Sequence, residues 1–141
     1  MKLKVTAAVV NGVNEPYVLE ELSLGELRYD EVLVKIVATG MCHSDEALRV
    51  GDAQYPLPAV LGHEGAGIIV EVGSAVKDLQ VGDQVVLSYN FCGTCPSCRT
   101  GHPSSCTSWA PLNMGGARLD GSTMFKKEDG TPVSNFFTQS S

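Results

Sequence analysis

Long apolar segments are missing from this 141-residue sequence. No run approaches the roughly 20 consecutive apolar residues that a membrane-spanning helix needs. The first ten residues carry two lysines and then a short apolar stretch, but that stretch stops at Asn11-Gly12, short of the roughly 7–15 residues of a secretory signal core. We therefore expect a cytoplasmic protein without a membrane partner, whose first ten residues form a strand.

Positive charge is also scarce. Lys and Arg total 10 against 16 Asp and Glu, which leaves a net charge of -6. Because nucleic acids and anionic membrane surfaces attract basic proteins, this balance argues against both as partners. Internal repeats and low-complexity tracts are absent as well. A hydrophobic fraction of 43% nevertheless supplies enough apolar material for the core of one domain.

Glycine and proline, in contrast, are frequent, with 15 and 7 residues. Chain-bending residues at this density favour short strands and turns over long helices. The apolar patterns predict strands at 2–10, 17–24, 31–41, 65–72 and 81–88, and the start of another at 132–137. The 31–41 segment is apolar on both faces, which is typical of a buried strand. The sequence thus predicts a mostly β domain, built as a small barrel or a partly open sheet.

The remaining segments are predicted to be less regular. One short helix is expected at 42–49, where Ser44 or Asp45 is suited to cap the N-terminus and Gly51 to end it. An irregular lobe is expected at 90–108, and a loop or short hairpin at 111–130. We expect the end of the chain, from residue 132, to be frayed.

Four of the five cysteines lie close together, at Cys92, Cys95, Cys98 and Cys106. An odd count with tight local spacing does not resemble a disulfide framework, and in a reducing compartment it indicates metal ligation. Structural zinc takes four thiolates in a tetrahedron, and spacings of two residues let a tight turn aim successive thiolates at one point. Because the segment has few apolar residues, we expect metal binding to order it. Such a closed site has no open position for chemistry.

Three alternatives to this zinc site remain. The cysteines can form a disulfide pair under oxidising conditions. They can hold an iron–sulfur cluster, since ferredoxins also use a C-x2-C-x2-C run. Finally, His102 can replace Cys106 as the fourth zinc ligand.

Cys42 and His63 form a second candidate site. Taken alone, a cysteine is usually a small core residue, and a lone histidine is more often structural than catalytic. Here His63 lies among three glycines, which let the backbone pack closely around a site. A thiolate and an imidazole suit catalytic zinc, which has three protein ligands and one open position. Asp45 can accept the N–H of a ligating histidine, and Ser44 can relay a proton.

At these residues the sequence resembles the medium-chain, zinc-dependent alcohol dehydrogenase family. The motifs that carry the resemblance are G-M-C-H-S-D at 40–45, L-G-H-E-G-A-G at 61–67, E-V-G at 71–73 and V-G-D-Q-V at 81–85. The four-cysteine lobe follows in the family's order, so the resemblance covers nearly the whole chain. A turn-rich stretch at 113–125, with Asp120-Gly121-Ser122, resembles the aryl and benzyl alcohol dehydrogenase branch.

The resemblance implies a GroES-like, partly open β-barrel as the catalytic domain of an NAD- or NADP-dependent enzyme. Its substrates would be primary alcohols, aryl alcohols among them, which it would oxidise to aldehydes by hydride transfer, and the parent enzyme would be a homo-oligomer. The resemblance implies that Cys42 and His63 are ligands of the catalytic zinc and that Glu64 is a carboxylate near that metal and an alternative ligand. It implies that Ser44 is the hydroxyl of the proton relay and that Asp45 orients His63. It also implies that His43 contacts the pyrophosphate of the cofactor.

The sequence departs from the family in three ways. The family's third catalytic-zinc cysteine lies further along the chain, and no cysteine remains here for that position. No G-x-G-x-x-G follows a strand, because Gly65-Ala66-Gly67 is followed by Ile68. Ala47 stands where many relatives carry the histidine that ends the proton relay. We therefore expect residues 1–141 to be a catalytic-domain fragment that lacks the nucleotide-binding domain and is inactive alone.

Two other functions fit the same sequence. One is a non-enzymatic, zinc-binding module folded like a co-chaperonin subunit, although Cys42, His63 and Glu64 would then have no purpose. The other is a redox or metal sensor that uses the cysteine lobe.

Overall fold

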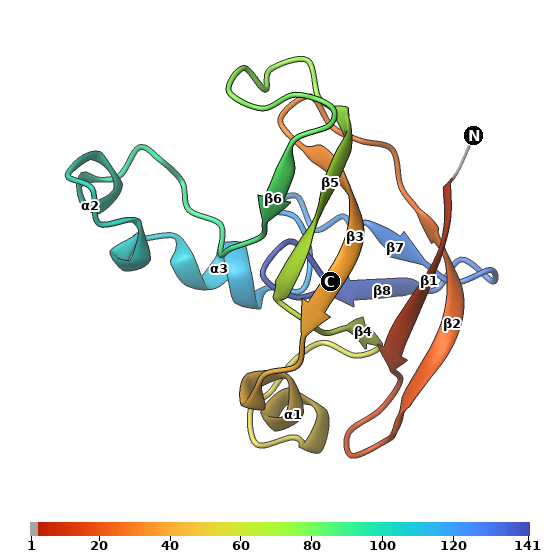
Figure 1. Cartoon of the computed structure of the whole chain (residues 1–141). Coiled ribbons are helices and arrows are strands. Elements are labelled where there is room, and N and C mark those ends of the chain that lie inside the picture. The colour runs from red at the N-terminus through yellow and green to blue at the C-terminus, as the bar shows by residue number, and fades with distance from the viewer. Residues whose placement is uncertain (1–2) are drawn as a thin grey trace.

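The computed structural model describes residues 3–141, and its strands form two sheets. Five strands close a barrel in the order β1–β2–β7–β8–β4, and three form a second sheet in the order β3–β5–β6 (Figure 1). The barrel strands are β1 (Leu3–Val10), β2 (Tyr17–Leu24), β4 (Ala59–Val60), β7 (Phe125–Lys126) and β8 (Pro132–Asn135). The sheet strands are β3 (Val32–Gly40), β5 (Glu64–Val72) and β6 (Gln84–Val86). The predicted mostly β fold around a barrel is confirmed. Lys2, part of the predicted first strand, lies outside the described residues.

The core divides into two apolar clusters that share the strands β1 and β4. Successive strand residues point to opposite faces, and Val9 accordingly packs with Leu22, Val60, Phe125 and Val133 in one cluster. Its neighbour Val10 packs with Leu48, Ala59, Leu61 and Phe136 in the other. The second cluster joins the barrel to the helix α1 and to the end of the chain, where the candidate site lies.

The predicted short helix is α1 (His43–Val50). Its N-cap is Cys42 instead of Ser44 or Asp45, so that prediction was wrong by two or three positions. Asp45 instead occupies the third helical position, from which its carboxylate accepts a hydrogen bond from the Cys42 N–H, 3.0 Å away. A carboxylate there satisfies a free helix N–H as an ordinary cap does. Gly51 ends the helix as predicted, with a left-handed φ of 87°.

Further helices occur where loops were expected. The lobe contains α2 (Pro96–Arg99) and a 3-10 helix at Pro103–Ser105, and α3 (Trp109–Met114) was missed altogether. Pro111 is compatible with α3, because it lies in the first turn, where backbone N–H groups have no helical partner. Among residues 3–141, no helix is long and apolar enough to cross a membrane.

One expectation about burial and one about strand length were wrong. The 31–41 strand was expected to be buried, but residues 35–39 of β3 are exposed, and Val37 is 64% exposed. Within the described residues β3 pairs only with β5, so it forms the edge of its sheet. The strand predicted at 81–88 is shorter in the structure, where β6 covers only Gln84–Val86.

The end of the chain was expected to be frayed, yet it packs against the core. Phe136 is 2% exposed. The Ser140 hydroxyl donates to the Val60 carbonyl at 2.7 Å, and the Ser141 N–H donates to the Gly62 carbonyl at 3.3 Å. These contacts bring the last residues beside the first residues of β5.

Candidate metal centres

The sheet β3–β5 brings the first candidate site together. Cys42 follows β3, whereas His63 precedes β5 and Glu64 begins it. In the antiparallel register Gly40 lies opposite Glu64, so the end of one strand meets the start of the other. As a result, one ligand atom each of Cys42, His63 and Glu64 lies within 4.8 Å of the others.

The side chain of Asp45 links the segments that carry this site, and it is completely buried. One carboxylate oxygen accepts from the Cys42 N–H at 3.0 Å. The other accepts from the Gly62 N–H at 3.0 Å and lies 3.1 Å from Nδ1 of His63. With Nδ1 engaged by the carboxylate, Nε2 is the nitrogen left to bind a metal.

Two aromatic rings pack against the same histidine. The ring centroid of Phe136 lies 4.9 Å from that of His63, and the centroid of Phe137 lies 4.7 Å from it. Phe137 in turn packs edge-on against Trp109 at 5.5 Å. Sequence reasoning missed all three aromatic residues, because Phe136 and Phe137 lie more than seventy positions from His63 in a segment expected to fray.

The remaining predicted residues lie at the rim. Ser44 is exposed, and its hydroxyl oxygen is 3.6 Å from Sγ of Cys42. His43 is exposed as the first residue of α1. Glu64 is exposed and places its carboxylate against Gly40, where any Cβ would collide with it. The glycine at position 40 is therefore what lets this carboxylate approach the site.

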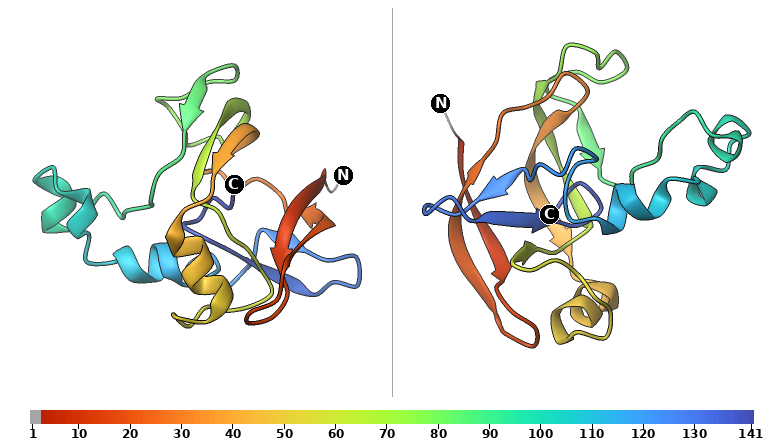
Figure 2. Two further views of the ribbon diagram at one scale, coloured as in Figure 1. Left: turned by 60° about the horizontal axis from the view of Figure 1, so that its bottom comes forward. Right: turned by 180° about the vertical axis from the view of Figure 1, so that it is seen from behind.

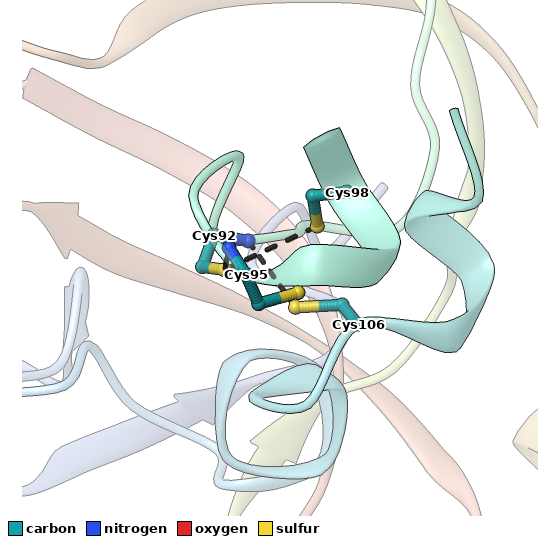
Figure 3. Close-up of side chains that lie close together, drawn as sticks. All are labelled: Cys92, Cys95, Cys98 and Cys106. Carbon is teal, nitrogen blue, oxygen red and sulfur yellow. Dashed lines mark hydrogen bonds between the residues drawn. The ribbon is translucent and has the colours of Figure 1, made fainter. Parts of the chain in front are cut away.

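The four cysteines of the lobe also converge. One Sγ from each lies within 4.8 Å of the others, and Figure 3 shows the sulfurs of Cys92, Cys95, Cys98 and Cys106 facing one another. All five cysteines of the chain are free thiols in this structure. His102 is outside the cluster, and its Nδ1 lies 3.5 Å from the Thr100 hydroxyl.

Backbone N–H groups point at two of these sulfurs and favour their ionised form. N–H groups of Thr94 and Cys95 lower the pKa of Cys92, and those of Cys98 and Thr107 lower the pKa of Cys95 to about 6. Hydrogen bonding to a thiolate stabilises the charged form. Burial, in contrast, raises the pKa of Cys98 to about 12. Since the thiolate is the form that binds a metal, the backbone prepares Cys92 and Cys95 for ligation.

Both donor sets fit zinc. Four thiolates within reach of one point match a closed structural site. A thiolate, an imidazole and a carboxylate leave a tetrahedral zinc with one open position, as a catalytic site requires.

The fold thus carries one closed and one open donor set, both suited to zinc. The family described as "Alcohol dehydrogenase GroES-like domain" matches residues 28–129, and the chain belongs to that family. All the predicted site residues lie within the matched range.

Similar proteins extend the match over the whole chain. The geraniol dehydrogenase of Castellaniella defragrans is 46% identical over 136 residues, which cover 96% of this chain and 36% of that protein. The solved benzyl alcohol dehydrogenase of Acinetobacter calcoaceticus is 45% identical, with a TM-score of 0.91, over 99% of this chain and 37% of that one. An alcohol dehydrogenase zinc-binding domain protein from Burkholderia ambifaria is 47% identical, with a TM-score of 0.97, over 100% and 38%. The chain thus spans little more than a third of the length of these relatives, and the predicted GroES-like fold and family are confirmed.

Proposed function

We propose that residues 1–141 form the zinc-binding catalytic domain of an enzyme that oxidises primary alcohols to aldehydes, with NAD or NADP as hydride acceptor. The observation that carries this proposal is the convergence of Cys42, His63 and Glu64 above the buried carboxylate of Asp45. Relatives named geraniol and benzyl alcohol dehydrogenase support it, since both names refer to primary alcohols. The rings of Phe136 and Phe137 beside His63 favour aryl alcohols among these substrates.

In this proposal Cys42, His63 and Glu64 hold the catalytic zinc, and the four lobe cysteines hold a structural zinc. Zinc supplies Lewis acidity, which eases loss of the alcohol proton near neutral pH. Asp45 holds the His63 ring in place and keeps Nε2 directed at the site. Ser44, whose hydroxyl lies beside Cys42, receives the alcohol proton. From Ser44 the proton passes to water, because Ala47 offers no titratable group.

Other parts of the function follow from the same proposal. His43, exposed beside Cys42, contacts the cofactor's pyrophosphate. The protein works in the cytoplasm, where thiols stay reduced, and the full-length enzyme is a homo-oligomer. The isolated chain carries no G-x-G-x-x-G, so it is inactive with benzyl alcohol and NAD.

Metal counting tests the two sites separately. Protein purified without chelator should carry about two zinc ions per chain, one for each donor set. Cys42→Ser should remove one of them, and Cys98→Ser should remove the other. A wild-type count of about one that Cys42→Ser leaves unchanged would reject the catalytic site. Iron in the lobe would reject structural zinc in favour of a cluster.

Activity tests the enzymatic part. Full-length protein should oxidise benzyl alcohol in the presence of NAD or NADP, and His63→Ala should abolish the reaction. A full-length protein that oxidises no primary alcohol would leave only the zinc-binding module.

A further inference from the structure

Phe137 is held against His63 by an unusual backbone. Its φ is 51°, in the left-handed region that bulky residues rarely adopt. Phe136, the other ring beside His63, is anchored by the apolar cluster around Val10 and Leu48. Phe137 packs against the same cluster and against Phe136 and Trp109, and in addition its N–H donates to the carbonyl of Asn113 at 3.1 Å. The position of this ring therefore depends in part on where Asn113 lies.

Asn113 is itself fixed by its side chain, which is 1% exposed. Its Oδ1 accepts from the Asn90 N–H at 2.7 Å, and its Nδ2 donates to the carbonyls of Asn90 and Trp109, both at 2.8 Å. A buried amide with three such bonds is held rigidly, and its loss would remove the partner that the Asn90 N–H has here.

Those two partners are the stems of the four-cysteine lobe. Asn90 lies two positions before Cys92, and Trp109 lies three positions after Cys106. Figures 1 and 2 show α3, which contains Trp109 and Asn113, between α2 in the lobe and the strands of the barrel. One side chain thus joins both stems, and the carbonyl of the same residue holds Phe137.

We propose that Asn113 is a positioning residue that fixes Phe137 against His63 and so couples the four-cysteine lobe to the Cys42–His63–Glu64 site. The inference rests on the proposed function, because it treats His63 as a metal ligand. Metal affinity depends on how well the groups around a ligand orient it. Asp45 restrains His63 at Nδ1, and the rings of Phe136 and Phe137 pack against the imidazole. When the stems separate, Phe137 loses its hydrogen bond to Asn113, and its restraint on His63 weakens.

The ring protons of His63 report its position directly by nuclear magnetic resonance, with no metal needed at that site. Phe137→Ala supplies the reference signals of a His63 without this ring, and Phe137→Tyr, which keeps the ring, should resemble wild type. Asn113→Leu keeps the branched shape of the side chain, with a larger volume, but removes all three side-chain hydrogen bonds. We expect its His63 signals to shift toward those of Phe137→Ala. Cys98→Ser, which opens the lobe, should shift them in the same direction.

Asn11→Ala is the matched control. It removes a polar side chain that bonds Glu20 and Lys127, away from both metal sites, so it should leave the His63 signals unchanged. The inference would be overturned if Asn113→Leu gave the same His63 signals as wild type. It would also be overturned if Asn11→Ala shifted the His63 signals as much as Asn113→Leu does.

Metal affinity gives the second readout. In competition with a chelator, the cobalt affinity of the Cys42–His63–Glu64 site should fall about tenfold in Asn113→Leu, the lower end of what loss of an orienting contact costs. An unchanged affinity would contradict the coupling. If wild-type protein binds no metal at this site, the proposed function fails, and the His63 signals still decide the role of Asn113.

Discussion

Replacing Asp45 with asparagine tests the organisation of the site with almost no change in shape. The carboxylate accepts hydrogen bonds from the N–H groups of Cys42 and Gly62 and engages Nδ1 of His63, all at 3.0–3.1 Å. An asparagine oxygen can still serve Gly62 and His63. Its NH2 group, however, must then face the Cys42 N–H, so that two donors oppose each other.

The cost follows from the burial of this residue, which is complete. One hydrogen bond to a charged group is lost, at about 1.5–3 kcal/mol, and a buried N–H is left unpaired. The two remaining bonds also lose the help of a negative charge. We expect Asp45→Asn to lower the free energy of unfolding by about 2–3 kcal/mol. With His63 less firmly oriented, the metal affinity of the site should fall about 10–100-fold.

Urea unfolding at a fixed zinc concentration measures the first quantity, with circular dichroism and the fluorescence of the single tryptophan as probes. The midpoint should fall while the slope stays constant. Glu46→Gln is the control, because it removes a charge from the next position on α1, where Glu46 pairs with Arg49 at the surface. A stability for Asp45→Asn equal to that of Glu46→Gln would refute the reasoning.

Three further predictions concern stability. Phe136→Ala should cost about 3–5 kcal/mol in urea unfolding, because it empties the centre of the second apolar cluster. Gly51→Ala should cost about 1–2 kcal/mol in thermal unfolding, since alanine is strained at the left-handed φ of 87°; a neutral result would mean that the helix end rearranges. Burial raises the pKa of Glu31, but its bonds to Arg118 and to the Arg28 N–H outweigh burial and hold it below its usual value. A carboxyl group whose pKa is lowered in the folded protein stabilises the fold at pH values above the ordinary carboxyl pKa. Arg118→Ala should therefore lower the free energy of unfolding at pH 7, and this difference from wild type should vanish as the pH falls through the lowered pKa of Glu31. A difference that persists in acid would contradict this.

Strands with clear alternation were predictable, whereas short or irregular elements were not. β2 was predicted to the residue, because polar turns bound its apolar pattern on both sides. β4 and β7 have two residues each, too few to show a period. α3 was missed because Pro111 and the glycines after it are typical of a loop. The exposure of β3 could not be predicted, since alternation reveals which residues are apolar but not whether another element covers them.

The sequence brought out the candidate site only in part. Local spacing pointed to the four cysteines, and short motifs pointed to Cys42, His63 and Asp45, which the structure places together. No local pattern pointed to Phe137 or Asn113, because their contacts join segments far apart in the chain. The roles of all these residues as ligands and supports stay predictions for the experiments above.

The two metal centres differ in the order in which a growing chain can complete them. The outermost lobe cysteines, Cys92 and Cys106, are 14 positions apart, so closing their loop costs little chain entropy. The barrel closes only when Leu24 meets Phe125, about a hundred positions later, and such distant pairings form slowly. A zinc ion can therefore order the lobe while the barrel is still open. The site at His63 can be completed only after Phe136 and Phe137, more than seventy positions further along the chain, have been synthesised.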